Sequence, residues 1–383
     1  MSKTIPLGKR ESEKLEFKGR DSRASDIARE VVAFLNAQGG ELWWGVAEAD
    51  GRGAALEPCQ DGEASKRDLQ NHLIDTLEPS PTIPAEVDIE PWPVEGGFVI
   101  CIRVKPAAPG RSPVAQLKDQ GRRYWIRVGD RVRTMSREEI RAKFAKGSQA
   151  SQEIETQLLA DRESILRRKN PCFWLKIRPD TELEPDIPRF LAEGRALLTD
   201  PTATGNRSSG WTFVRELVYP QTFANGLRMK DAFEEMEIRF DGVIEFMAPL
   251  DRLHWKGGEK EIWPYALIEY PVSVLRLAAK VFEKWGADVS EAFVEFAFVG
   301  LRHWTLGGGS PRDPSGRFRD PPDFKEDDLV PEKPFRFKRR EIIEEPDRCG
   351  FRLITYIYRA FGYEESAVPP EFDRKTGLLV IPR

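Results

Sequence analysis

The chain has 383 residues, which is enough for two ordinary domains. Apolar residues make up 40% of it and include 10 Trp and 22 Phe, so the chain can build hydrophobic cores and is not globally disordered. Its formal net charge of −4 excludes a uniformly basic protein of the chromatin type, although a local basic face remains compatible with it.

Membrane and secretory classes are not expected from the sequence. No apolar run approaches the roughly 18 to 20 residues of a membrane helix, and the N-terminus lacks the apolar region of a secretory signal. The four cysteines are far apart, which fits neither a zinc site nor a disulfide framework. With three histidines, a histidine-based metal cage is not expected either. We therefore expect a cytoplasmic protein.

The first 147 residues alternate strand and helix patterns and predict one α+β domain. The clearest helix follows Ser25, the expected N-cap, and stops at Gly39. A second cap is expected at Ser136, where Glu139 completes a capping box. The other elements are expected as strands at 14–18, 42–46, 85–90, 98–105 and 123–128, and a helix at 65–77.

Residues 148–170 predict a helical linker, and residues 171–383 predict a second α+β domain. The dipeptide Asp241-Gly242 between two apolar strands is a hairpin signal. A helix is expected to begin at Pro271. Strands are expected at 292–306 and 335–342, a polar loop at 307–328 and a closing helix at 351–361.

Three carboxylates flank the first helix and its neighbouring strands: Glu11, Glu16 and Glu48. If the strand of Glu16 pairs with residues 42–46, all three can meet at one end of a small sheet. Three carboxylates without histidine or cysteine suit a hard cation such as Mg²⁺ or Mn²⁺. The alternative is that these acids are ordinary solvated surface groups, as most of the 63 acids in the chain must be.

Basic residues concentrate between 103 and 146, where 13 Lys and Arg accompany four acids. Strand alternation places Arg123, Trp125 and Arg127 on one face, and Arg131 and Arg133 follow at the same period. An aromatic ring among arginines fits phosphate-backbone binding with base stacking. The candidate nucleic-acid contacts are Lys18, Arg122, Arg123, Arg127, Arg131 and Arg133. The alternative is a solvated sheet face whose arginines pair with acids elsewhere.

Three segments resemble the signatures of the Schlafen-type Alba-like domain, a family often described as DNA-binding or divergent ATP-binding. They are ESEKLEFK at 11–18, VAFLNAQGGELWWGV at 32–46 and YWIRVG at 124–129. The three occur in order and cover about a third of the chain. No resemblance is apparent in residues 150–383.

The resemblance implies a function as well as a fold. Animal Schlafens of this type use three acids to bind a divalent metal and cut structured RNA, notably transfer RNA. Their first two acids match Glu11 and Glu16, and the third falls at Glu48, with Asp50 as the alternative. Many bacterial members are thought to bind nucleic acid, and some are linked to phage defence. Animal members pair two lobes in one chain, so this single copy implies a homodimer.

These observations lead to three alternative hypotheses about function. The first is a metal-dependent endoribonuclease in which Glu11, Glu16 and Glu48 hold Mn²⁺ or Mg²⁺ and the arginines hold structured RNA. The second is a non-catalytic regulator that binds DNA or RNA. In the third, residues 171–383 form a sensor or an oligomerisation unit that controls the first domain.

Overall fold

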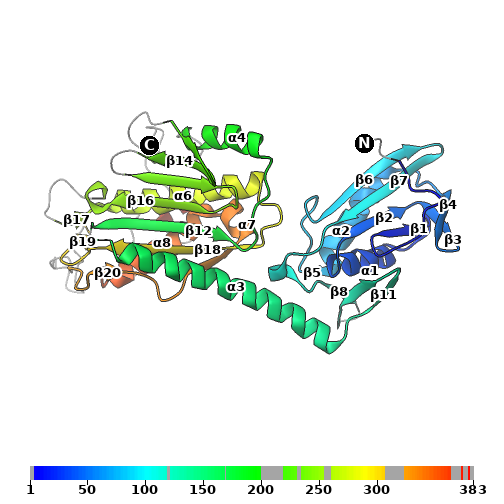
Figure 1. Ribbon diagram of the computed structural model, residues 1–383, viewed down its shortest axis with the longest axis horizontal. Coiled ribbons are helices and arrows are strands. Elements are labelled where there is room, and N and C mark those ends of the chain that lie inside the picture. Colours follow the sequence, from blue (N-terminus) through cyan, green and yellow to red (C-terminus); the bar gives the residue numbers. More distant parts are fainter. Residues whose placement is uncertain are drawn as a thin grey trace. The chain divides into compact units, whose positions relative to one another are not determined.

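The computed structural model describes residues 4–118, 121–168, 170–199, 219–230, 234–253, 260–306, 323–363, 372–373 and 378–379 (Figure 1). The chain divides into two compact units, Met1–Ser151 and Gln152–Arg383. Each combines helices with β-sheet, which confirms the α+β fold class. Across these described ranges, no helix has both the length and the apolar character needed to cross a bilayer.

The N-terminal unit is built on a four-stranded sheet in the order β1-β2-β7-β6 (Figure 1). These strands are β1 (Leu15–Lys18), β2 (Gly40–Trp44), β7 (Gly97–Val104) and β6 (Val87–Val94). β1 runs parallel to β2, and the other pairs are antiparallel. The helices α1 (Ala24–Leu35) and α2 (Gly62–Thr76) pack with this sheet in the main core of the unit.

The two faces of this sheet differ. Leu42 and Ile102 belong to the core shared with α1 and α2, whereas Phe17 and Trp43 belong to a smaller core on the other face. Glu16 is the register partner of Leu42, so its carboxylate lies on the helix side of the sheet. A charged residue on a buried face needs partners, so cations of the same domain must lie near Glu16.

Smaller β-structures surround the sheet. They are the hairpin β3 (Val46–Ala49) and β4 (Arg52–Leu56), the sheet of β5 (Leu77–Glu78), β8 (Ala115–Lys118) and β9 (Gly121–Arg123), the hairpin β10 (Trp125–Val128) and β11 (Arg131–Thr134), and the 3₁₀ turn η1 (Pro109–Arg111). The predicted strand 123–128 is therefore interrupted at Tyr124. Buried Asn36 fixes this region to the end of α1, because its amide donates to the carbonyls of Val114 (2.7 Å) and Trp125 (2.9 Å).

Both predicted helix caps can be compared with the structure. The expected N-cap at Ser25 is wrong: α1 begins at Ala24, behind an extended Arg23. The capping box at Ser136 is confirmed, since Ser136 N–H donates to Glu139 (2.8 Å) and Glu139 N–H donates to the Ser136 hydroxyl (3.2 Å). The helix after this cap, α3 (Arg137–Leu166), is continuous and includes most of the predicted linker.

The second unit is built on a mainly antiparallel sheet in the order β13-β14-β15-β16-β12-β18-β20, with β21 also paired to β18. The strands are β12 (Cys172–Pro179), β13 (Gln221–Phe223), β14 (Gly226–Lys230), β15 (Glu235–Arg239), β16 (Ile244–Pro249), β18 (Glu291–Val299), β20 (Asp328–Leu329) and β21 (Phe335–Lys338). Its helices are α4 (Ile187–Thr199), α6 (Pro264–Lys284), α7 (Arg339–Glu344) and α8 (Pro346–Ala360). The short elements are η2 (Leu250–Arg252), β17 (Glu261–Ile262), β19 (Thr305–Leu306), β22 (Phe372–Asp373) and β23 (Leu378–Leu379).

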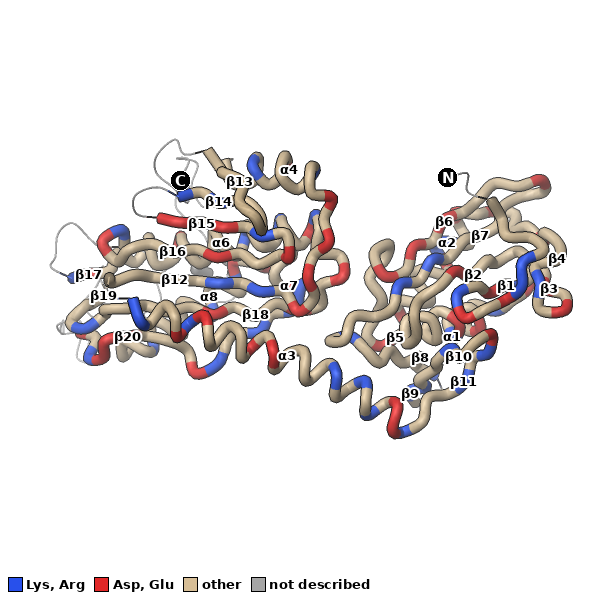
Figure 2. Tube along the Cα trace, viewed as in Figure 1, with Lys and Arg blue, Asp and Glu red and all other residues tan. Residues whose placement is uncertain are grey.

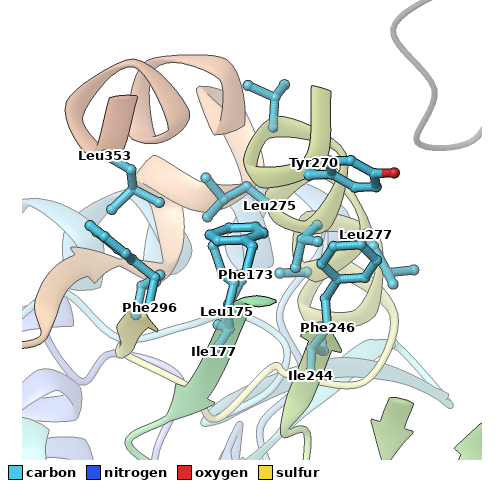
Figure 3. Packing of buried hydrophobic residues seen from close by; sticks show 14 of the residues in the cluster. Phe173, Leu175, Ile177, Ile244, Phe246, Tyr270, Leu275, Leu277, Phe296 and Leu353 are labelled. Carbon is cyan, nitrogen blue, oxygen red and sulfur yellow. The ribbon is translucent and has the colours of Figure 1, made fainter. Parts of the chain in front are cut away.

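The core of the second unit lies between this sheet and α6 and α8. Phe173, Phe246 and Phe296 project from β12, β16 and β18 toward Leu275 of α6 and Leu353 of α8 (Figure 3). All five side chains are fully buried. Burial of aromatic and branched side chains of this size contributes roughly 1.5–3 kcal/mol each to stability, and the cysteines of the unit, Cys172 and Cys349, are free thiols.

Several predictions for this unit can be checked. The hairpin at Asp241-Gly242 is confirmed, and Gly242 has the positive φ (87°) that the turn requires. The helix start at Pro271 is wrong: α6 begins at Pro264, and Pro271 lies buried inside it. The predicted strand 292–306 stops at Val299 because Gly300 turns the chain with a φ of 76°.

The C-terminal end of this unit also differs from its prediction. The predicted strand 335–342 becomes β21 followed by α7, and the closing helix is confirmed as α8. Most of the expected loop at 307–328 lies outside the described residues, which resume at 323.

The other face of β12 and β18 packs against α3 and carries buried charges. Glu295 of β18 is completely buried, and its Oε1 lies 3.4 Å from a terminal nitrogen of Arg162 in α3. Its register neighbour Lys176 pairs with Asp161 (2.8 Å) and Glu245 (3.1 Å). Burial raises the pKa of Glu295 to about 7, although Arg162 opposes the shift.

This carboxyl makes the stability of the unit depend on pH. A folded-state pKa above the unfolded value means that Glu295 stabilises the fold below about pH 4.5 and that this contribution is lost as pH rises through 7. We expect Glu295→Gln to remove that loss, so its melting temperature relative to wild type should be higher at pH 8 than at pH 5. Thermal unfolding by circular dichroism measures this difference. Glu163→Gln, on the exposed side of α3, is the control, and the same pH trend in both variants would contradict the assignment.

Candidate nucleic-acid interface

The structure links the three predicted acids through the backbone at the end of β1. The Glu11 carboxylate accepts the Phe17 N–H (3.1 Å), which places it beside Glu16. The Glu11 N–H donates to the Gly51 carbonyl (2.8 Å), and the Gly51 N–H donates to the Glu48 carboxylate (2.5 Å). Hydrogen bonds therefore connect the segment of Glu11 and Glu16, at β1, with Glu48 of β3, and the meeting of all three carboxylates at one ion stays a prediction.

The electrostatics of Glu11 agree with this placement. Burial raises its pKa, the Phe17 N–H lowers it, and the carboxylates of Glu16 and Glu48 raise it further. Of the two alternatives for the third acid, Glu48 lies close enough to act on Glu11 in this way. Asp50 occupies the turn itself, with a positive φ of 53°.

Glu16 does not face solvent, because Arg127 of β10 covers it. The Arg127 side chain is 1% exposed and lies 2.8 Å from Glu16 and 3.3 Å from Glu30 of α1. Its guanidinium also donates to the carbonyls of Ser12 (2.8 Å) and Leu15 (3.1 Å). This buried arginine cannot reach a nucleic acid in this arrangement, so the predicted contact at Arg127 is replaced by a role inside the domain.

Lys18 is the second cation held by these acids. Its ammonium contacts Glu16 directly and lies 3.5 Å from Glu30, which Arg29 also contacts at 3.0 Å. Burial lowers the pKa of Lys18, but the surrounding carboxylates raise it more, and the net pKa lies above its ordinary value. The charge of Lys18 is therefore already matched within the protein.

Carboxylate oxygens are the donors that Mg²⁺ and Mn²⁺ prefer, but this arrangement does not fit an ion as it stands. Both oxygens of Glu16 are engaged, one by Lys18 and one by Arg127. In the parts of the chain that the structure describes, no group of three acid, histidine or cysteine side chains is placed to hold a metal. An ion at Glu16 would have to displace the Lys18 ammonium.

Two further predicted contacts are paired with acids of the same domain. Arg122 donates to both oxygens of Glu78 (2.5 and 2.9 Å), and Arg133 donates to both oxygens of Glu139 (2.6 and 2.7 Å). Arg133, together with the Ser136 N–H, lowers the pKa of Glu139 to about 2. All four side chains are at least one-third exposed, so these pairs are weak and open to exchange.

Four exposed arginines form what we call the basic surface: Arg123, Arg131, Arg137 and Arg141. Within the described ranges, none of them makes an ion pair with the protein. Lys and Arg positions recur along β9, β11 and the first turns of α3 (Figure 2). Only Arg123 and Arg131 were predicted as contacts. The spacing of Arg137 and Arg141, one helical turn apart after the Ser136 cap, is the signal that identifies the other two.

Part of the chain matches a known protein family. Residues 11–136 match the model of the Schlafen, AlbA_2 family. No curated protein matches the chain.

Among the solved structures that are similar to this chain, two cover about a third of it. The DIP2311 protein from Corynebacterium diphtheriae is 24% identical, with a TM-score of 0.25 over 33% of this chain and 23% of its own. The N-terminal domain of a RecG-related protein from Nitrosomonas europaea is 21% identical, with a TM-score of 0.25 over 33% of this chain and 84% of its own.

The family match supports a nucleic-acid-binding role for the matched segment. It confirms the resemblance drawn from the three signatures and covers residues of the first unit alone. Residues 11–136 of this chain therefore form a Schlafen AlbA_2 domain.

Proposed function

We propose that the N-terminal domain binds the phosphate backbone of nucleic acid through the basic surface. The observation that carries this proposal is that Arg123, Arg131, Arg137 and Arg141 are exposed without an ion pair in the described residues, in a chain whose net charge is −4. Arginines that the protein does not neutralise itself are available to phosphate, whose bidentate geometry they match. Structured RNA is the favoured ligand, recognised by the shape of its backbone.

Binding through these arginines should depend on salt. We expect Arg131→Ala to weaken binding of the full chain to an RNA hairpin and to a DNA duplex alike. It should reduce the slope of log affinity against log salt by about 1, because one phosphate contact is lost. Fluorescence anisotropy with labelled probes at several salt concentrations measures both quantities. Arg340→Ala, an exposed arginine of the second unit paired with Glu344, is the control. An Arg131→Ala variant with unchanged affinity and slope would contradict the proposal.

Arg127 should behave differently from Arg131 because it is buried. Arg127→Met leaves the carboxylates of Glu16 and Glu30 without their shared cation, and breaking a buried pair costs about 3–5 kcal/mol. Arg131→Met, the matched surface change, should alter stability by about 0.5 kcal/mol or less. Denaturant unfolding followed by circular dichroism compares the two. Equal stabilities would show that the buried network does not hold the domain together.

A second candidate is metal-dependent cleavage of structured RNA such as tRNA. Its support is the set of hydrogen bonds that connects the segments of Glu11, Glu16 and Glu48. For an ion to bind, Lys18 would first have to leave Glu16. Glu11, Glu16 and Glu48 would then be the oxygen ligands, and Mn²⁺ or Mg²⁺ would supply water activation and neutralisation of phosphate charge. The second lobe would come from a homodimer, since the signatures occur once in the chain. Lys18 would leave Glu16 for a phosphate of the bound strand.

Cleavage can be tested at the two acids outside the Arg127 network. We expect Glu11→Gln and Glu48→Gln to abolish Mn²⁺-dependent cleavage of tRNA while RNA affinity stays equal or rises, because a carboxylate that repels phosphate is removed. Gel analysis of labelled tRNA with Mn²⁺, Mg²⁺ or EDTA measures the activity.

Two further variants complete that test. Glu13→Gln, an exposed neighbour, is the control, and Asp50→Asn distinguishes the alternatives for the third acid. A wild-type protein that binds tRNA but does not cut it with either metal would leave only the binding function.

A further inference from the structure

Two aromatic side chains of the N-terminal unit lie in contact with each other outside its hydrophobic core. Phe144 of α3 is 51% exposed, although phenylalanine is usually buried. Its ring meets that of half-buried Tyr124 edge to face, with centroids 6.4 Å apart and planes at 79°. Tyr124 is the residue that interrupts the strand between β9 and β10. The pair therefore leaves aromatic surface open to solvent at the junction of these strands with α3.

The pair lies among the arginines of the basic surface. Arg137, Arg141 and Phe144 follow one another at four and three residues, so they share one face of α3. Arg123 directly precedes Tyr124 and is exposed. Nearby Lys143 has a pKa below its ordinary value, lowered first by burial and then by Lys146, while Glu139 opposes the shift. An occupant of this site must therefore tolerate several positive charges.

The sequence assigned base stacking to Trp125, but the structure turns that ring inward. Trp125 packs against the core that contains α1, and its indole N–H donates to Gln116 (2.9 Å). Its neighbour Arg127 points the same way, into the network with Glu16. Trp125 and Arg127 thus face the interior, and aromatic contact with a ligand has to come from elsewhere.

We infer that Tyr124 and Phe144 form a stacking platform for an unpaired nucleobase of a strand whose phosphates are held by Arg141 and Arg123. This inference rests on the proposed nucleic-acid binding and adds the class of ligand, which is RNA or DNA with unpaired bases. The charge around the pair selects this occupant, because a base brings an aromatic face together with anionic phosphates. A neutral apolar partner would leave the arginines unmatched.

The experiment compares two probes for the full chain: an RNA hairpin with a single-stranded loop and a blunt duplex of equal charge. Stacking of a base on an aromatic ring contributes enough binding free energy that Phe144→Ala should weaken loop binding by roughly tenfold. Duplex binding and the salt slope should stay the same, because no phosphate contact is removed. Phe144→Trp should restore loop binding. Fluorescence anisotropy gives all of these affinities.

Ile74→Ala is the matched control, because Ile74 is a similarly exposed apolar residue on α2 of the same unit. Equal loss with both probes, or no loss with either, would overturn the platform. If the wild-type protein binds neither probe, the proposed function fails instead. Phe144→Ala is expected to keep the melting temperature of the wild type, since half of the side chain is already solvated. A large fall in melting temperature would assign Phe144 to folding and refute the inference.

Discussion

The N-terminal domain depends on one buried guanidinium. Arg127 belongs to β10, its carboxylate partners belong to β1 and α1, and its carbonyl partners lie at the start of β1. An arginine fork can satisfy several acceptors at once in fixed directions, so this side chain joins β10 to Glu30 of α1 and Glu16 of β1, which lie 97 and 111 residues earlier in the chain. The ring of Phe34, 4.9 Å from the guanidinium, closes the site from the core side. This contact attaches the β10–β11 hairpin to β1 and α1.

This network also divides the positive charges of the domain into two groups. Arg127 and Lys18 are held by buried or half-buried carboxylates, and releasing either would leave an acid without its partner. The second group makes no ion pair in the described part of the chain and consists of Arg123, Arg131, Arg137 and Arg141. A local count of basic residues cannot distinguish the groups, because burial and pairing determine which charges remain available to phosphate. The interface that we propose is therefore smaller than the sequence suggests and includes residues of α3.

The helices and strands could largely be predicted from the sequence, whereas the face that each strand turns toward the core could not. Alternation in β1 correctly placed Glu16 and Lys18 on one face, and the glycine at Gly39 correctly predicted that the first helix stops before β2, although α1 itself ends at Leu35. The same alternation grouped Arg123 with Trp125 and Arg127, but periodicity does not reveal which face of a strand is inward. Tyr124 breaks the strand, so Arg123 and Arg127 belong to different sheets. Pro271 was misplaced for a related reason: a buried helix can accommodate a proline that local rules assign to a helix start.

Both units bury a carboxylate within a sheet, but they differ in how completely cations and hydrogen bonds pair with it. In each, a charged residue lies on the sheet face that is turned toward a helix. Glu16 has a cation on each oxygen, and Arg127 in turn satisfies four acceptors. Glu295 has one cation at 3.4 Å, and within the described residues its second oxygen accepts no hydrogen bond. Incomplete compensation is the reason that burial raises the pKa of Glu295 to about 7. Near neutral pH, the charge of the buried Glu295 carboxyl beside Arg162 of α3 therefore changes with pH, whereas the N-terminal network supplies a cation to each oxygen of Glu16.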